Sequence, residues 1–178
     1  PFLQQYQLNR LIAFVNPNID PYGIGYNIIQ SKIAVGSGMI TGRGYLAGTQ
    51  TQLNFLPEKH TDFIFAVLAE EFGFIGVAVV LIIYLFLLLQ ILKVAARAKD
   101  GFGQLIALGV LGLFLFHILE NVGMVLGIMP ITGIPLPFIS YGGSFMVISL
   151  IAIGLVININ MRRKKIIDTI TAVGLDEE

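Results

Sequence analysis

A cluster of ionisable residues stands directly before a long apolar segment. Glu58, His60 and Asp62 lie within five positions of one another, and residues 63–92 are predominantly apolar. An acid in this position would lie where lipid meets water, and it could take a proton from the hydroxyl of a membrane-anchored substrate. General-base assistance of this kind is typically worth about 10²–10⁴ in rate. Asp62 is therefore a candidate catalytic base, although Asp62 or its neighbour Thr61 could equally cap a helix that begins after it.

The same cluster could also hold a divalent cation. One histidine and two acids over five residues do not match a standard metal-ligand spacing. Mg²⁺ or Mn²⁺ held by Asp62, Glu58 and a substrate diphosphate would still be chemically consistent, because magnesium favours carboxylates together with phosphates. Glu58 and Lys59 are more often solvated loop charges. Roles of Glu58 and His60 in cation or substrate binding are therefore alternatives that the residues leave open.

Two basic residues lie among glycines earlier in the chain. Lys32 and Arg43 accompany the runs Gly36-Ser37-Gly38 and Gly42-Arg43-Gly44. Glycine allows the backbone to approach a ligand closely, and together with a cation such segments can cradle a phosphate. Glycine-rich loops are common in proteins, so this pattern alone does not establish a phosphate site.

The composition is that of an integral membrane protein. Hydrophobic residues make up 56% of the 178 residues and charged residues 12%, whereas soluble domains are about a quarter charged. The formal net charge is zero, which argues against nucleic-acid binding. The chain has no cysteine, so neither a disulfide framework nor a thiolate metal site can form within it. It begins at Pro1 without a methionine, which suggests part of a longer protein.

Three segments are long enough to span a bilayer, which requires about 20 mostly apolar residues. They cover approximately residues 63–92, 102–129 and 137–159, and each is expected to be helical because an open strand in lipid leaves backbone groups unpaired. Basic residues follow the first span and the third, whereas the connector 130–137 carries no charge. The positive-inside rule makes the basic ends cytoplasmic, so that Asp62 and the connector 130–137 share the outer face.

The region before the first span differs in kind, because prolines and glycines interrupt any long periodicity. Short amphipathic helices lying in the membrane interface are expected at about Leu8–Val15 and Tyr26–Val35. A loop of this length is usually functional rather than only a connector. The sequence thus predicts an all-α polytopic membrane protein with a large extracellular loop (1–62), three transmembrane helices (within 63–160) and a cytoplasmic tail (161–178).

Polar residues inside the predicted spans need partners. Glu70 and Glu71 fall about two turns into the first span, where a charge costs roughly 2.5–3.5 kcal/mol on insertion scales. Each is expected to face protein, with packing partners on helices absent from this chain. His117, Glu120 and Asn121 share one face of the second span. Such a cluster indicates either a functional site or an interhelical hydrogen-bond network, and we favour the network.

The segment 131–144 combines two prolines, two adjacent glycines and the pair Ser140-Tyr141. Pro135 and Pro137 prevent a regular helix, and irregular backbone at membrane depth is tolerated only where it is buried or lines a cavity. We therefore expect Ser140 and Tyr141 to form another wall of the site that contains Asp62.

Several motifs together resemble the SEDS family (shape, elongation, division and sporulation). In chain order they are Gly25-Tyr26, Gln30-Ser31-Lys32, Gly36-Ser37-Gly38, Gly48-Thr49-Gln50, the run from Leu56 to Ala66 and the run from Gly133 to Ser144. The resemblance covers nearly the whole chain. The Gln-Ser-Lys and Gly-Thr-Gln runs look more like the RodA branch than the FtsW branch of division proteins.

The resemblance implies a peptidoglycan glycosyltransferase of the bacterial inner membrane with ten transmembrane helices, of which this chain would supply the last three. Its substrate would be lipid II, its partner a class B penicillin-binding protein, and its essential aspartate Asp62. Asp62 would deprotonate the C4 hydroxyl of the acceptor's N-acetylglucosamine, whose oxygen would displace undecaprenyl diphosphate from the donor with inversion. Lys32, Arg43 or a divalent cation would offset the charge that develops on the diphosphate.

Two other functions fit part of the pattern. A transporter that flips a lipid-linked precursor would use the polar cluster of the second span and the broken segment around Pro135 and Pro137, which resembles a discontinuous helix. A scaffold for partner proteins would tolerate replacement of Asp62. The Asp62→Asn variant separates these functions from a glycosyltransferase.

Overall fold

The computed structural model describes residues 8, 10, 12–14, 16, 23–53, 55–56 and 60–162. Helices are present at positions 8, 10 and 12–14 and in five longer elements, and the described residues contain no β-strand. The elements are α2 (Ile24–Gly38), α3 (Thr49–Gln52), α4 (Ile64–Ala96), α5 (Gly101–Leu126) and α6 (Gly143–Met161). The all-α class is therefore confirmed.

Helices α4, α5 and α6 are each long and apolar enough to cross a membrane. Helix α5 ends where Gly127 adopts the left-handed conformation typical of a helix C-terminus. Helix α6 begins only at Gly143, because the proline-containing segment before it cannot be helical. Large apolar side chains such as Phe86, Leu105 and Ile151 are exposed on these helices, as expected for surfaces in contact with lipid or other membrane helices. The chain is a multi-pass membrane protein.

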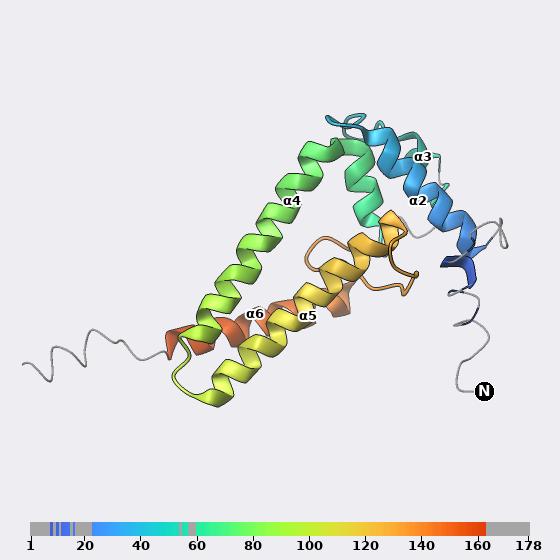
Figure 1. Ribbon diagram of the computed structural model, residues 1–178. Coiled ribbons are helices and arrows are strands. Elements are labelled where there is room, and N and C mark those ends of the chain that lie inside the picture. The colour runs from blue at the N-terminus through green and yellow to red at the C-terminus, as the bar shows by residue number, and fades with distance from the viewer. Residues whose placement is uncertain are drawn as a thin grey trace, which may run out of the picture.

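Helix α4 is sharply bent at Gly73. A straight helix of 33 residues would be about 50 Å long, well beyond the hydrocarbon thickness of about 30 Å. Gly73 has the non-helical angles φ 64° and ψ −164°, and Figure 1 shows a short limb and a long limb meeting at this point. The span expected over about residues 63–92 is thus helical, but it is bent at Gly73. Only the limb from Phe74 to Ala96, about 34 Å long, matches the membrane thickness.

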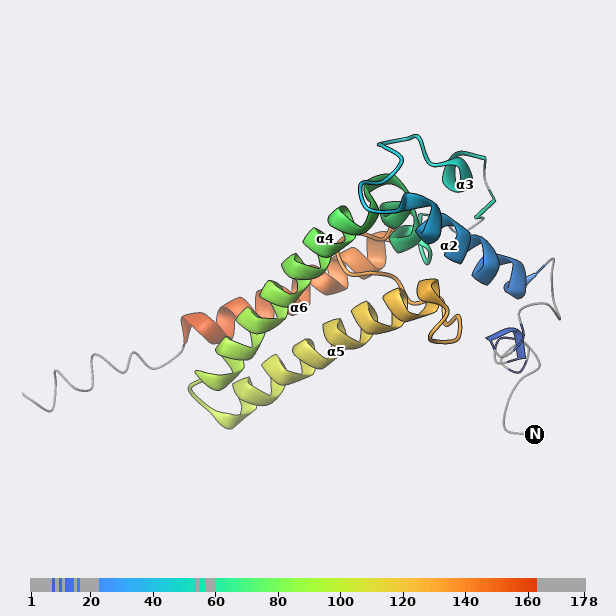
Figure 2. The same cartoon turned by 45° about the horizontal axis from the view of Figure 1, so that its top comes forward.

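The loop after α2 fills this break in α4. Figures 1 and 2 show α2 beside the short limb, with α3 on the same side of the bend. Four main-chain hydrogen bonds connect the loop to the bend: Phe74 N to Met39 O (2.9 Å), Ile75 N to Ile40 O (3.1 Å), Arg43 N to Glu70 O (3.0 Å) and Gly44 N to Glu71 O (3.0 Å). Backbone groups that the bend removes from the helical ladder are thus paired again, as a low-dielectric environment requires.

Glu70 is fully buried beside α3, not against helices missing from this chain. Its carboxylate accepts hydrogen bonds from the backbone N–H groups of Gln50 (2.9 Å) and Thr51 (3.1 Å), and so caps the first turn of α3. The expectation that the partners of Glu70 lie outside this chain is therefore wrong. The bend at Gly73 is the physical reason, because it carries Glu70 to the vertex where α3 lies. Glu71 is also buried there.

Two apolar clusters hold the helices together. One lies near the bend and the C-terminal half of α5, and it includes Phe63, Leu56 and Met124. The other lies between the far ends of α4, α5 and α6, where Ile91, Phe114 and Val156 are buried. Together they fix α5 against both α4 and α6, and they place the C-terminal end of α5 beside the start of α4.

Gly73→Ala should destabilise the protein by about 1–3 kcal/mol, because a residue other than glycine is strained at positive φ. The added Cβ would also overlap the Gly42 amide nitrogen and lie 2.7 Å from the Ile40 carbonyl oxygen. Thermal unfolding in detergent measures the effect. Gly112→Ala in α5 is the matched control, since its Cβ meets nothing within 4 Å. Equal melting temperatures for the two variants would contradict the described bend.

Candidate active site

The segment that carries Asp62 is held by its backbone. Three successive carbonyls each accept a hydrogen bond from α5 or from the segment before α6: His60 O from Tyr141 N (2.8 Å), Thr61 O from Ser140 Oγ (2.7 Å) and Asp62 O from Asn121 Nδ2 (2.9 Å). We call this arrangement the carbonyl clamp. Because it uses main-chain atoms of residues 60–62, it fixes the backbone position of Asp62.

The proline-containing segment that supplies the clamp is itself tightly held. Four successive carbonyls of residues 134–137 are paired: Ile134 O with Asn121 Nδ2 (2.8 Å), Pro135 O with His117 Nδ1 (3.1 Å), Leu136 O with Ser140 N (3.0 Å) and Pro137 O with the Tyr84 hydroxyl (2.5 Å). For three of these four carbonyls the partner is a side chain from α4 or α5, which replaces the partner that irregular backbone lacks. These bonds hold the segment in place beside residues 60–62.

The Asp62 carboxylate lies against Gly133. Asp62 is half-buried, and a Cβ added to Gly133 would come within 3.1 Å of Asp62 Oδ2. Gly133 has a φ of 76°, so glycine is required both for the backbone conformation and for the space beside the carboxylate. The alternative role of Asp62 or Thr61 at the N-cap is not what the structure shows, since Phe63 holds that position.

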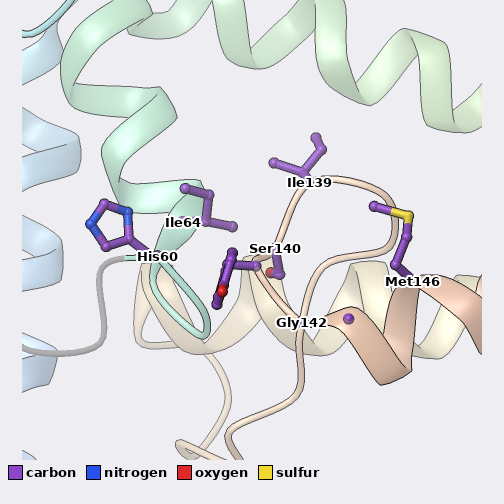
Figure 3. Close-up of a pocket in the computed structure, with 8 residues that line it drawn as sticks. His60, Ile64, Ile139, Ser140, Gly142 and Met146 are labelled. Atoms are coloured by element: carbon purple, nitrogen blue, oxygen red, sulfur yellow. The ribbon is translucent and has the colours of Figure 1, made fainter.

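An open cleft of about 560 Å³ lies beside the segment that contains Asp62, and Figure 3 shows residues that line it. Its lining includes His60 and Ile64, which flank Asp62 in sequence, together with Ile139, Ser140, Tyr141, Gly142, Gly143 and Met146. The structure therefore brings His60, Ser140 and Tyr141 together in one cleft, and their roles toward a substrate stay predictions. His60 is exposed and Tyr141 is 80% exposed, so both are available to a ligand. Asp62 itself borders this cleft without lining it.

Ser140 is buried and its hydroxyl is already committed to protein. It accepts a hydrogen bond from Leu136 N (2.7 Å) and donates one to Thr61 O. Ser140 therefore has a structural role, because its only hydroxyl hydrogen is used in the carbonyl clamp, and the expected substrate contact of Ser140 stays a prediction.

Lys32 and Arg43 contact different elements. The Lys32 ammonium lies against Gly127 at the C-terminal end of α5, where a cation complements the helix dipole. The Arg43 guanidinium donates to Thr49 Oγ1 (3.2 Å) and Ser37 O (3.4 Å), close to the buried Glu70. Both cations are exposed at other parts of their surface. Lys32 and Arg43 therefore do not form one glycine-rich phosphate pocket, and a phosphate would have to contact each of them separately.

The polar cluster of α5 forms a hydrogen-bond network, as favoured from the sequence. His117 and Asn121 bind carbonyls of residues 134–135, and Glu120 Oε1 accepts from Thr132 Oγ1 (2.9 Å). The partners lie on the segment before α6 rather than on another helix. The role of Asn121 in holding the backbone of Asp62 was not predicted from the sequence. The available signal was that Asn121 shares one helical face with His117 and Glu120.

Glu58 lies outside the described residues, so its proposed contacts with substrate or cation are untested. Within residues 60–162 and the other described positions, no group of three His, Asp or Glu side chains could hold a metal ion. Of the two acids suggested as ligands, the described structure places only Asp62. The divalent cation thus stays a prediction.

Asn121→Leu should loosen the Asp62 segment, because the Asp62 and Ile134 carbonyls would lose their shared donor. An unpaired buried carbonyl costs about 1–3 kcal/mol, so we expect amide hydrogen exchange at residues 60–64 to accelerate about tenfold or more. Ser149→Ala is the control, since Ser149 Oγ bonds only within α6, to Phe145 O. Equal exchange in both variants would argue against the carbonyl clamp.

Comparison with known proteins identifies the family of this chain. A family model described as cell cycle protein, covering FtsW, RodA and SpoVE, matches residues 1–165. The peptidoglycan glycosyltransferase MrdB of Escherichia coli strain K12 is 48% identical over 162 residues, which are 91% of this chain and 44% of MrdB. The peptidoglycan glycosyltransferase RodA of Treponema pallidum is 53% identical over 161 residues, covering 90% of this chain and 37% of RodA.

A solved structure is similar as well. It comes from a study of how a peptidoglycan synthase complex coordinates polymerization and crosslinking. The match has a TM-score of 0.71 and 32% sequence identity. The match covers 92% of this chain and 44% of that chain. This chain thus spans less than half the length of these relatives. From the family match and these relatives together, the chain belongs to the FtsW/RodA/SpoVE family of cell cycle proteins, the SEDS family.

Proposed function

We propose that the full-length protein carrying this sequence is a peptidoglycan glycosyltransferase that polymerises lipid II for cell-wall elongation and cell shape. The observation that carries the proposal is the position of Asp62: the carbonyl clamp holds its backbone, and its sequence neighbours His60 and Ile64 line an open cleft. The names of the relatives, peptidoglycan glycosyltransferases MrdB and RodA, support the same activity.

Asp62 acts as the general base in this proposal. It takes the proton of the acceptor's C4 hydroxyl, and the resulting oxygen forms a bond to the anomeric carbon of the donor sugar. The bond to undecaprenyl diphosphate breaks, its electron pair leaves with the diphosphate, and the configuration inverts. A rigid base positioned within hydrogen-bond reach of the hydroxyl is what such a step requires. The rigidity comes from the clamp, whose three bonds are 2.7–2.9 Å long.

The cleft next to Asp62 is proposed to hold part of the sugar chain. Its wall is mostly apolar, with His60 and Tyr141 as the exposed rings. Exposed aromatic rings offer a flat apolar face combined with a polar edge, which suits a sugar ring. The Tyr141 backbone N–H donates to His60 O (2.8 Å), so the main chains that carry the two rings are held together next to Asp62.

Charge on the departing diphosphate needs a counterion. We propose Lys32 of α2 for this role, because its ammonium lies against Gly127 at the C-terminal end of α5. Arg43, in contrast, donates to Thr49 beside the buried Glu70. A divalent cation held by Asp62, Glu58 and the diphosphate is a second proposal. We route no step through it, because the described residues supply only one of its protein ligands.

The location and partner are proposed on similar grounds. The basic connector after α4 and the basic end of α6 are proposed to lie in the cytoplasm of a bacterium, with Asp62 on the outer side of the inner membrane. A class B penicillin-binding protein is the proposed partner, supported by similarity to a peptidoglycan synthase complex that couples polymerization with crosslinking.

The transporter alternative is less well supported by the geometry. His117, Glu120 and Asn121 would have to bind a moving substrate, yet all three are engaged with the segment at residues 132–135. Breaking this network on every transport cycle would leave buried polar groups unpaired, at about 1–3 kcal/mol each. The scaffold alternative assigns no role to a carboxylate beside the cleft.

Asp62→Asn should reduce glycan polymerisation by about 10²–10⁴, since the amide cannot accept the proton. Lipid II polymerisation by the full-length protein with its class B partner, in liposomes, measures this. Melting temperature and partner binding should stay close to those of the wild type, because the backbone hydrogen bonds of the carbonyl clamp are kept and the amide has nearly the shape of the carboxylate. Lys93→Gln, an exposed charge change at the far end of α4, is the control. Full activity of Asp62→Asn would contradict the role of Asp62 as general base and favour the scaffold or transporter function.

Gly133→Ala should lower polymerisation by about 10- to 100-fold while the protein still folds. The new Cβ would press on Asp62 Oδ2 at 3.1 Å, and displacement of a reacting group by about 1 Å can cost 10²-fold. Gly109→Ala in α5 is the matched control, because its Cβ meets nothing within 4 Å. Wild-type rates for Gly133→Ala would mean that the carboxylate does not need its described position.

A further inference from the structure

A second cavity lies at the opposite end of the molecule from Asp62. It has a volume of about 650 Å³ and is formed by the connector after α4, the first turn and a half of α5 and the last turns of α6. Its lining residues are Lys99, Asp100, Phe102, Gly103, Ile106, Leu155, Asn158, Ile159 and Arg162. Figure 1 shows the start of α5 and the end of α6 at this same end. No step of the proposed glycosyl transfer uses it.

The polar side of this cavity carries two cations from distant parts of the sequence. Lys99 precedes α5 and Arg162 follows α6, and both are exposed. Asp100 is the acid of the lining, and its Oδ1 is directed to the first turn of α5, 3.2 Å from where a Cβ on Gly103 would lie. A carboxylate at that place complements the positive end of the helix dipole. The lining thus carries two cations against one acid, together with the Asn158 amide.

The other side of the cavity is apolar. Phe102, Ile106, Leu155 and Ile159 line it, and Phe102 is 73% exposed. These residues lie on the membrane-spanning helices α5 and α6, so the apolar wall continues toward the lipid phase. A ligand for this cavity therefore combines an anionic group at the membrane surface with a hydrocarbon chain that runs along the helices.

We propose that this cavity binds an anionic glycerophospholipid of the leaflet at the basic end of the helices. The lipid phosphate would lie between Lys99 and Arg162, and the first part of one acyl chain would lie against Ile106 and Leu155. Basic pockets between transmembrane helices on the cytoplasmic side are suited to such headgroups. The volume is in the range that holds a headgroup with several methylene groups. The lipid would fasten α6 to α5 at the end remote from the carbonyl clamp.

Binding of phosphatidylglycerol to the full-length protein in detergent, followed by native mass spectrometry, tests the proposal. Phosphatidylcholine of the same chain length is the zwitterionic comparison. Each cation near an anionic headgroup contributes about 5-fold, so the double variant Lys99→Gln/Arg162→Gln should bind phosphatidylglycerol roughly 25-fold more weakly. Its binding of phosphatidylcholine should change little.

A matched control separates a built site from general attraction to a basic surface. The double variant Lys93→Gln/Arg97→Gln removes the same charge from exposed positions on the same side, and neither residue lines the cavity. It should bind phosphatidylglycerol as the wild type does. Ile106→Trp keeps both cations but fills the apolar part, and it should weaken retention of the lipid.

Three results would overturn the proposal. Equal losses in the two double variants would mean diffuse electrostatic attraction. Displacement of the lipid by inorganic phosphate or glycerol 3-phosphate at equal concentration would mean a simple anion site. Absence of lipid binding, with a lower melting temperature in Lys99→Gln/Arg162→Gln, would mean that another segment of the full-length protein occupies the cavity.

Discussion

The candidate site depends on one constraint: backbone that leaves the helical ladder inside a membrane must find other partners. Residues 60–62 and 134–137 are both irregular, and each supplies carbonyls that no helix pairs. The structure satisfies them together, through Asn121, Ser140 and the backbone of Tyr141. Unpaired groups in this environment cost several kcal/mol each. The same bonds that make the irregular segments tolerable therefore hold Asp62 in place.

The bend in α4 obeys the same constraint at a second point. Gly73 interrupts the helix, and the loop at residues 39–44 restores four main-chain hydrogen bonds. The bend brings Glu70 to α3, where it caps a helix whose N–H groups would otherwise be unpaired. The short limb of α4 is thereby fixed at both of its ends, by the loop at the bend and by the carbonyl clamp at Asp62. Positioning of the carboxylate is thus distributed over segments far apart in the sequence.

Much of this could be predicted from sequence because the signals were local. Charge spacing and long apolar runs give the three spans, and the position of Asp62 before one of them gives the candidate base. Pro135 and Pro137 indicated irregular backbone near the same site. The bend at Gly73 was not predictable in this way, because glycine is common in straight transmembrane helices and only the loop that fills the break makes it bend. Three further features depend on contacts between segments far apart in the sequence and were not predictable either. They are the pairing of Glu70 with α3, the separate contacts of Lys32 and Arg43, and the two hydrogen bonds that Asn121 donates.

The most direct test of Asp62 as the base asks whether a carboxylate at that position is itself required. This chain has no cysteine, so Asp62→Cys creates a single thiol within it, and a full-length protein with any other cysteines replaced can be alkylated there alone. Lipid II polymerisation should be lost in Asp62→Cys, should recover in part after iodoacetate installs a carboxylate, and should not recover after iodoacetamide installs a neutral amide. Activity in the unmodified variant, or equal recovery with both reagents, would contradict general-base catalysis by Asp62.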